Sequence, residues 1–313
     1  MNLRRIMLLV CLLSLAALTT AACALQELPA AFHERPRVPT ITPGVRSTPV
    51  PPAMPTAVAS LPAPATLALQ PVVPTRQAIP ILMYHHLLDL EPDASEDLLS
   101  YSESPGDFAA QMAYLADQGY HTIHFSDVLA YFNEGRPLPE KPVIITFDDG
   151  WADCYTIAYP ILQQHGMTAT FFIPSNWIEN VEGTLTWAQI QEMSQGGIEF
   201  GSHSVTHPYL TTSEPDALAW ELEYSKQTLE ERLGKPVTAL AYPFGLYDQT
   251  VIEAVQKAGY TSAVTIDPGQ WVSEENLFTL KRIGVPYWTD MNAFVAELHN
   301  TGPSEEQPAQ PSS

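Results

Sequence analysis

A regular alternation of short apolar runs with longer amphipathic segments, between Ile79 and Val264, constrains the fold more than any other feature of this sequence. Apolar runs of about four to eight residues predict buried strands. The longer segments carry helix signals, such as the cap Ser104 with proline in the first turn and the stop Gly119. The predicted strands are 79–84, 143–147, 168–173, 198–201, 237–242 and 261–264, and the predicted helices are 104–119, 155–165, 187–193, 215–233 and 249–257.

Strand and helix alternation at this spacing predicts an α/β fold with a parallel sheet. With about seven strands we expect the sheet to close into a distorted (β/α)7 barrel, incomplete relative to the eightfold barrel, within a single catalytic domain. In such barrels the reacting groups gather at the carboxyl ends of the strands. Polar residues that directly follow a predicted strand are therefore the candidate site residues.

Two adjacent carboxylates, Asp148 and Asp149, follow the predicted strand 143–147 and precede Gly150. Neighbouring side chains diverge, so the two can do different jobs. One can bind a metal while the other takes a proton from water. A solvated turn is the alternative for an Asp-Asp-Gly sequence taken alone.

Two histidines, His203 and His207, follow the predicted strand 198–201. Imidazoles four residues apart can meet one ion if the segment forms a helical turn. Together with one carboxylate they make a His, His, Asp set. Catalytic zinc sites use three protein ligands and leave one position for water.

The segments Thr146 to Gly150 and His203 to His207 resemble the first two motifs of the polysaccharide deacetylase (NodB-homology) family, carbohydrate esterase family four. The resemblance extends over roughly residues 79–298 and implies the distorted barrel of seven strand-helix units known from NodB-homology and glycoside hydrolase/deacetylase domains. It implies that Asp148 is the general base and that Asp149, His203 and His207 hold a divalent metal. Zinc is the default for these ligands, which also accept nickel, cobalt or iron.

The third motif of the family is similar to Ala241-Tyr242-Pro243-Phe244-Gly245. An arginine that orients the base normally stands where this chain has Ala241, so we expect that arginine to be missing. The resemblance implies substrate binding by Tyr242, Pro243 and Phe244, with the Phe244 backbone N–H stabilising the oxyanion. A simple strand-ending turn is the alternative.

The fourth motif is matched in part by Asp267 to Trp271, with Gln270 in place of the second acid. Losing that acid fits losing the arginine with which it would pair. Trp271 could stack on a sugar ring of the substrate, and a buried core tryptophan is the alternative.

The general acid is expected at the end of the first strand, because no histidine stands near residues 281–285, where the family usually has one. The segment Met83 to His86 resembles the branch of the family that acts on poly-N-acetylglucosamine, in which the acid comes first. We assign the acid to His85, with His86 as the alternative. The remaining histidines are expected to be ordinary surface or core residues: His33, His121, His124, His165 and His299.

The resemblance implies removal of N-acetyl groups from an extracellular polymer of N-acetylglucosamine by Asp base and His acid chemistry. The alternatives are an O-acetyl polysaccharide esterase and a non-catalytic carbohydrate-binding wall lipoprotein. The formal charge of −21 makes nucleic acid an unexpected partner, because acidic surfaces repel phosphates. A polymer that becomes cationic on deacetylation would suit this charge, and solubility is the other explanation. We expect a monomer.

Residues 1–23 have the layout of a secretory signal, in which Arg4 precedes an apolar run from Ile6 to Leu18 and small residues up to Cys23. The final Thr-Ala-Ala-Cys resembles a lipobox, which would make Cys23 the lipidated N-terminus. Ordinary cleavage and an uncleaved signal anchor are the alternatives. All three place the rest of the chain outside the cytoplasm, either as a membrane-anchored lipoprotein or as a secreted protein.

Residues 24–77 contain 12 prolines and almost no aromatic residue, so we predict a disordered linker. At about 3.1 Å per residue in polyproline II geometry, such a linker spans on the order of 100 Å or more. It would hold a catalytic domain, residues 78–300, away from a membrane. Residues 301–313 predict a disordered tail.

Overall fold

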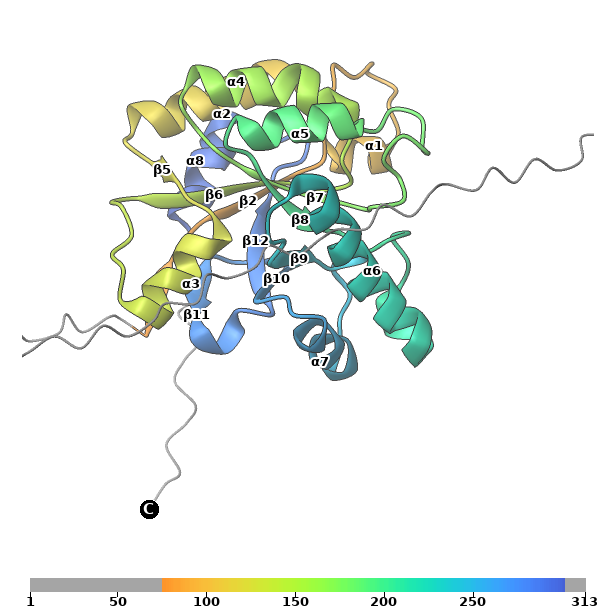
Figure 1. The fold of residues 1–313 in the computed structure, drawn as a ribbon. Coiled ribbons are helices and arrows are strands. Elements are labelled where there is room, and N and C mark those ends of the chain that lie inside the picture. The colour runs from red at the N-terminus through yellow and green to blue at the C-terminus, as the bar shows by residue number, and fades with distance from the viewer. Residues whose placement is uncertain (1–74, 302–313) are drawn as a thin grey trace, which may run out of the picture. The chain divides into compact units, whose positions relative to one another are not determined.

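Seven parallel strands close into a barrel in the computed structural model, which describes residues 75–301 (Figure 1). The predicted signal peptide with Cys23, most of the predicted linker and the tail from 302 onward lie outside the described residues. The predicted seven-stranded barrel is confirmed, because the last strand in the row pairs again with the first. Around the barrel the strands are β2 (Ile81–Tyr84), β12 (Leu280–Gly284), β10 (Ser262–Pro268), β9 (Ala239–Ala241), β8 (Glu199–Ser202), β7 (Thr170–Ile173) and β6 (Pro142–Phe147).

Helices cover the outside of the barrel, as Figure 1 shows. The predicted helices at 215–233 and 249–257 have the bounds expected of them, and Ser104 caps the helix that follows it by accepting from the Asp107 N–H. None of the helices between residues 75 and 301 is long and apolar enough to cross a membrane. They are α1 (Glu96–Ser100), α2 (Pro105–Asp117), α3 (Phe125–Glu134), α4 (Tyr159–Gln164), α5 (Trp187–Gln195), α6 (Pro215–Leu233), α7 (Gln249–Lys257) and α8 (Met291–His299).

Side chains of the central strand β6 alternate between the two sides of the barrel wall. Val143, Ile145 and Phe147 pack outward against the helices, whereas Ile144 packs inside the barrel with residues of the inner core. Because successive side chains of a strand point to opposite faces, Thr146 and the following Asp148 continue the inward row. The same periodicity therefore builds the core and carries one carboxylate into the mouth of the barrel.

Helix α3 and strand β12 are absent from the predicted pattern. Helix α3 contributes Phe125 and Val128 to the inner core and so closes the amino-terminal end of the barrel. Its N-cap is His124, which is not a usual capping residue. Strand β12 carries Lys281 and Arg282 among its five residues, so its apolar pattern is broken.

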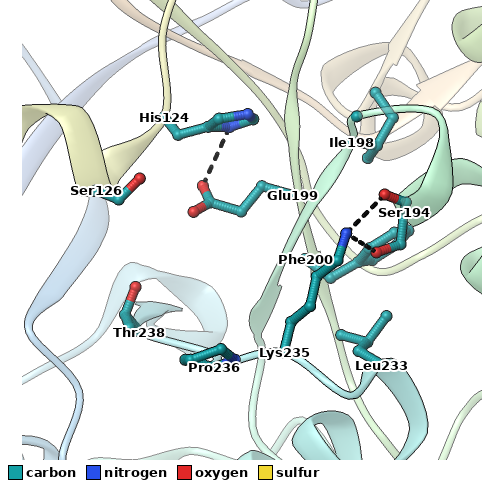
Figure 2. A pocket seen from close by; sticks show the side chains of 11 residues that line it. His124, Ser126, Ser194, Ile198, Glu199, Phe200, Leu233, Lys235, Pro236 and Thr238 are labelled. Carbon is teal, nitrogen blue, oxygen red and sulfur yellow. Dashed lines mark hydrogen bonds and ion pairs between the residues drawn. The ribbon is translucent and has the colours of Figure 1, made fainter.

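A cavity of about 560 Å³ opens at the amino ends of β8 and β9, opposite the carboxyl ends of the strands (Figure 2). His124 lies on its wall with Nδ1 3.5 Å from Glu199 Oε2, and Lys235 Nζ donates to the Ser194 carbonyl at 2.8 Å. Burial lowers the pKa of His124, but the interaction with Glu199 outweighs burial and the pKa lies above its usual value. In barrels of this kind the reacting groups gather at the opposite end, so the expectation that His124 is an ordinary structural residue is unchanged.

Candidate active site

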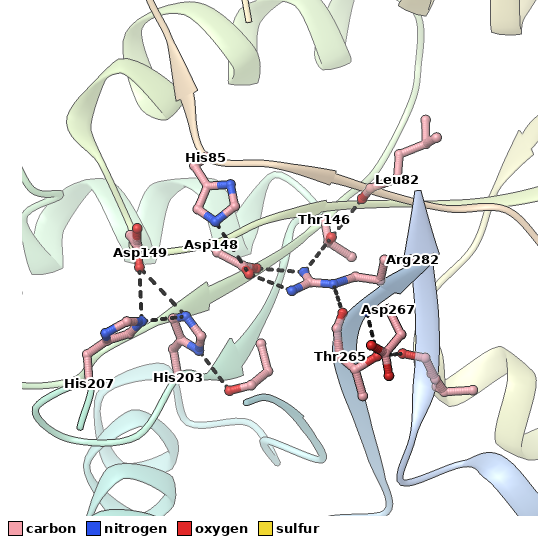
Figure 3. A network of polar contacts seen from close by, with 12 residues as sticks. Leu82, His85, Thr146, Asp148, Asp149, His203, His207, Thr265, Asp267 and Arg282 are labelled. Atoms are coloured by element: carbon pink, nitrogen blue, oxygen red, sulfur yellow. Dashed lines mark hydrogen bonds and ion pairs between the residues drawn. The ribbon is translucent and has the colours of Figure 1, made fainter. Parts of the chain in front are cut away.

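The carboxyl ends of three strands bring the predicted base, acid and metal ligands together at one mouth of the barrel (Figure 3). Asp148 and Asp149 follow β6, and His203 follows β8. His85 follows β2, which pairs with β6 along its whole length. The neighbourhood predicted from the strand ends is therefore present, although the residues come from segments more than a hundred positions apart.

Asp149, His203 and His207 form a compact group of possible metal ligands. Asp149 Oδ1 lies 3.6 Å from Nε2 of each histidine, and the two Nε2 atoms are 3.1 Å apart. Among the described residues, this buried oxygen has no hydrogen-bond partner. A divalent cation between the three atoms would satisfy the orphaned oxygen and both nitrogens, which is the donor set of a catalytic zinc site. The residues present thus fit a metal.

Both imidazoles are held in the neutral form that binds metals. His203 Nδ1 donates to the Ala241 carbonyl at 2.7 Å, and because a carbonyl only accepts, Nε2 of the neutral ring carries the lone pair. Burial lowers the pKa of His203 to about 4, despite the opposing charge of Asp148. Burial and the neighbouring His203 likewise lower the pKa of His207 to about 4. At neutral pH no proton therefore competes with a cation for Nε2 of His203.

The two imidazoles meet although the loop that carries them does not form the helical turn that was given as the condition for it. Ser204 and His207 adopt the left-handed region, with φ of 66° and 60°, and the Ser204 hydroxyl accepts the His207 N–H at 3.0 Å. Six described non-glycine residues have positive φ. Four of them lie at this site, because Asp149 and Phe244 also have positive φ. Such conformations persist only where their surroundings enforce them, and they cluster at functional sites, which supports a functional role for this mouth of the barrel.

An arginine holds Asp148, the predicted base, contrary to the expectation that this arginine is missing. Arg282 on β12 donates from two nitrogens to the two oxygens of Asp148, at 2.8 and 2.6 Å. Burial would raise the pKa of Asp148, but the charge and hydrogen bonds of Arg282 lower it well below its usual range. Ala241 does stand at the motif position, yet the guanidinium reaches the same carboxylate from another strand. Asp148 is therefore ionised and fixed in orientation.

Arg282 was missed because β12 was not predicted. Leu280 packs in the inner core, so two residues later Arg282 also points into the barrel, where it is fully buried. Its guanidinium also donates to the Thr146 hydroxyl at 3.1 Å and the Thr265 carbonyl at 2.7 Å. The sequence signal that could have revealed this strand is the apolar and polar alternation at the start of residues 280–284.

The two candidate acids differ in their surroundings. His85 Nε2 lies 3.9 Å from Asp148 Oδ2, inside the site. Burial lowers the pKa of His85, against the carboxylates of Asp148 and Asp149, which raise it. His86 is turned away, with Nδ1 2.7 Å from Asp153 Oδ2 and its ring stacked 4.4 Å from the Trp151 ring. Of the two histidines, the geometry therefore favours His85 as the candidate acid, because it lies beside Asp148.

Two of the predicted substrate-binding side chains lie elsewhere. Tyr242 is fully buried, and its hydroxyl donates to the Phe278 carbonyl at 3.0 Å, so its side chain cannot contact a substrate. Trp271 lies on β11 (Trp271–Ser273), paired with β1 (Arg76–Ala78) ahead of β2, and its indole donates to the Thr301 carbonyl at 2.7 Å. It is thus at the other end of β2 from His85, because the chain leaves the barrel wall after Pro268.

Aromatic rings line the mouth of the barrel beside the ligand group. Phe244 and Tyr209 stack with centroids 4.2 Å apart, and they are 41% and 52% exposed. Phe244 also packs edge-on against His207, while Pro243 beside it is buried. The Trp151 indole donates to Asp149 Oδ2 at 3.2 Å. Sequence reasoning missed Tyr209 and Trp151, since both stand in loops without a repeating pattern.

The chain is similar to known proteins in both sequence and structure. A profile of the family described as polysaccharide deacetylase matches residues 135–263. The chain is 32% identical over 222 residues to "Putative polysaccharide deacetylase YxkH" of Bacillus subtilis (strain 168), which covers 71% of this chain and 76% of that protein. It is 25% identical over 226 residues to the poly-beta-1,6-N-acetyl-D-glucosamine N-deacetylase of Staphylococcus epidermidis, with 64% and 77% covered. The solved structure of the Streptococcus pyogenes deacetylase PplD in complex with acetate superposes with a TM-score of 0.67 at 31% identity, over 72% of this chain and 99% of that one.

Proposed function

The chain belongs to the polysaccharide deacetylase family, and from that premise we propose that it is a metal-dependent hydrolase that removes N-acetyl groups from an extracellular polymer of N-acetylglucosamine. The observation that carries the proposal is the orphaned Asp149 Oδ1 facing two imidazole nitrogens, beside the ionised Asp148. Relatives named as poly-beta-1,6-N-acetyl-D-glucosamine N-deacetylases support the substrate class.

A divalent metal, zinc by ligand type, would be held by Asp149, His203 and His207. When bound, it would supply Lewis acidity toward the acetyl carbonyl and make water easier to deprotonate. Nickel, cobalt or iron would suit the same ligands. Trp151 would keep Asp149 oriented through the indole hydrogen bond, as a neighbour of a ligand commonly does.

Proton transfers fall to Asp148 and His85. Asp148, ionised and fixed by Arg282, takes a proton from water as the water oxygen forms a bond to the acetyl carbonyl carbon. The Phe244 backbone N–H donates to the carbonyl oxygen as negative charge develops there. The carbon–nitrogen bond then breaks, acetate leaves, and His85 gives its proton to the sugar amine. Burial lowers the pKa of His85, so the ring must first take up a proton from solvent, and the imidazolium formed is then a stronger acid toward the amine than an ordinary histidine.

The exposed pair of Phe244 and Tyr209 would hold the sugar ring. Stacked aromatic faces beside the ligand group offer an apolar surface to the C–H face of a pyranose while its hydroxyls remain solvated. Tyr242 and Pro243 would contribute through the conformation of their loop, in which Phe244 has a φ of 59°. Trp271 has no part in this site.

For the rest of the chain we retain the expected organisation. Residues 78–300 form the catalytic domain, as a monomer. Residues 1–23 act as a secretory signal, with Cys23 as the lipid attachment point if the lipobox is used, and residues 24–77 link the domain to the membrane. The protein would then work outside the cytoplasm, either anchored as a lipoprotein or secreted.

Acetate release from N-acetylglucosamine oligomers by the purified full chain tests the function. We expect release by the zinc-loaded protein, none after chelation, and recovery when zinc or cobalt is restored, because Asp149, His203 and His207 would be without their ion. Acetate would be measured enzymatically at matched protein concentration. A protein that binds zinc but releases no acetate from any acetylated glycan would contradict the proposal and support the carbohydrate-binding alternative.

An O-acetyl polysaccharide esterase is the second candidate, favoured by the lowered pKa of the buried His85. An alkoxide leaving group needs less help from an acid than an amine does. For a deacetylase we expect His85→Ala to slow amide hydrolysis by about 10²–10⁴-fold and ester hydrolysis far less. The comparison uses N-acetylated and O-acetylated oligosaccharides, with His86→Ala as the matched control. Equal losses on both substrates would count against His85 as the acid.

A further inference from the structure

The buried face of α6 holds a carboxylate against the loop that carries the two histidines. Glu221 is 5% exposed, and its Oε2 accepts the backbone N–H groups of Val205 and Thr206 at 2.8 and 2.9 Å. Its Oε1 accepts the Thr206 hydroxyl at 2.5 Å. One side chain from a helix thus receives three donors from two consecutive loop residues, between the two histidines.

The Glu221 contacts lie at the part of the loop whose backbone conformation is least favourable. Val205 and Thr206 lie between Ser204 and His207, the two residues with positive φ. Successive N–H groups near a left-handed residue converge on one point and form an anion-binding concavity. Here the anion is a side chain of the same protein. The Glu221 carboxylate therefore stabilises the backbone conformation that turns His207 toward His203.

The remaining groups of the loop are also fixed from outside it. The Ser175 and Asn176 N–H groups donate to the carbonyls of Ser204 and Val205 at 3.1 and 3.0 Å. On the α6 side, the Ser202 hydroxyl contacts the Ser225 hydroxyl. The loop is thus clamped through its carbonyls by one segment and through its N–H groups by Glu221.

We propose that Glu221 is a positioning residue for the metal, which sets metal affinity by fixing residues 205 and 206 so that Nε2 of His207 meets Nε2 of His203 and Oδ1 of Asp149. The inference rests on the proposed metal site. The hydrogen bonds of Glu221 go to the backbone of Val205 and Thr206 and to the Thr206 hydroxyl, so it acts on the metal ligands only through this loop. Its contribution is to organise the ligands before the ion arrives, which lowers the cost of binding.

The test compares Zn²⁺ affinity in Glu221→Met, Glu221→Gln and the matched control Glu223→Met, an exposed residue of the same helix. Methionine keeps the length but removes every acceptor, so we expect the Kd for Zn²⁺ to rise about 10–100-fold. Glutamine can accept both N–H groups and donate to the Thr206 hydroxyl, so affinity should return to near the wild-type value. The control should not change. The full chain is used, with a chromophoric competitor for Zn²⁺ and the visible absorption of bound Co²⁺ as a second readout.

If Glu221 only stabilises the fold, the variants should give different stability and Zn²⁺-binding results. In that case Glu221→Met lowers the melting temperature of the metal-free protein, yet leaves the Kd within about twofold of the wild type and the Co²⁺ spectrum unaltered, which would overturn the proposal. If Glu221→Met does not fold, Thr206→Val replaces it, because it removes one contact from a surface residue. We expect about three- to tenfold weaker Zn²⁺ binding for Thr206→Val, and unchanged binding would likewise overturn the proposal.

The outcome is separable from that of the proposed function. Weaker Zn²⁺ binding in Glu221→Met, together with no acetate release by any form, supports the positioning role and contradicts the deacetylase proposal. Absence of Zn²⁺ and Co²⁺ binding by the wild type overturns both.

Discussion

Asp148→Asn should slow acetate release by about 10²–10⁴-fold, because it removes the group proposed to take the proton from water. Asparagine has nearly the same shape and can still accept from Arg282 through its carbonyl oxygen. It cannot take up a proton at neutral pH. The rate would be measured on N-acetylglucosamine oligomers at a temperature where both proteins are fully folded, with Asp117→Asn, an exposed aspartate of α2, as the matched control.

Metal affinity distinguishes a lost base from a damaged site. Asp148 is not among the three grouped ligand atoms, so Zn²⁺ should bind Asp148→Asn with nearly the wild-type Kd. A variant that retains more than about a tenth of the wild-type rate with metal bound would show that another group acts as the base. A variant that has lost the metal would instead place Asp148 among the ligands.

Arg282→Met should lower the free energy of unfolding by about 3–5 kcal/mol, the usual result when one partner of a buried ion pair is removed. Asp148 is 2% exposed and Arg282 is fully buried, so water cannot replace the lost guanidinium. Catalysis should fall as well, because burial then raises the pKa of Asp148 without opposition from Arg282. Chemical denaturation at neutral pH measures the first effect, and acetate release measures the second.

A double variant shows whether the loss belongs to the pair. Asp148→Asn combined with Arg282→Met removes both charges, so it should be more stable than the sum of the two single losses predicts. Lys257→Met, an exposed cation in the last turn of α7, should change stability by no more than about 0.5 kcal/mol. If Arg282→Met resembles this control, the ion pair does not stabilise the fold.

Much of the fold could be predicted because its signals are local. Helix α6 begins at Pro215 and is followed by Gly234 in the left-handed conformation, so its bounds are those expected from the sequence. The neighbourhood of Asp149 and His203 followed from one physical rule, that parallel strands in a barrel share a carboxyl end. Each of these inferences needed only the local pattern around a helix end or a strand end.

The remainder depends on contacts between distant segments. Arg282 sits in a strand whose charged residues break the apolar pattern, and only the closed barrel shows that its side chain points inward beside Asp148. Tyr242 lies on the opposite face from the one a substrate would use, which a motif match does not reveal. The position of Trp271 could not be predicted either, because it depends on where the chain leaves the barrel wall after β10.

Strand β12 is the last strand of the barrel to be synthesised, so Asp148 is oriented late in the synthesis of the chain. By His207 an emerging chain has all three grouped ligand residues, but the guanidinium that fixes Asp148 arrives only with Arg282, seventy-five positions later. The pairs β12 to β2 and β12 to β10 must then form before that guanidinium reaches its carboxylate. A chain released or cut before residue 282 would retain the aspartates and histidines but lack the guanidinium that orients Asp148. On the proposed mechanism, hydrolysis would therefore begin only when the whole domain has been made and has closed.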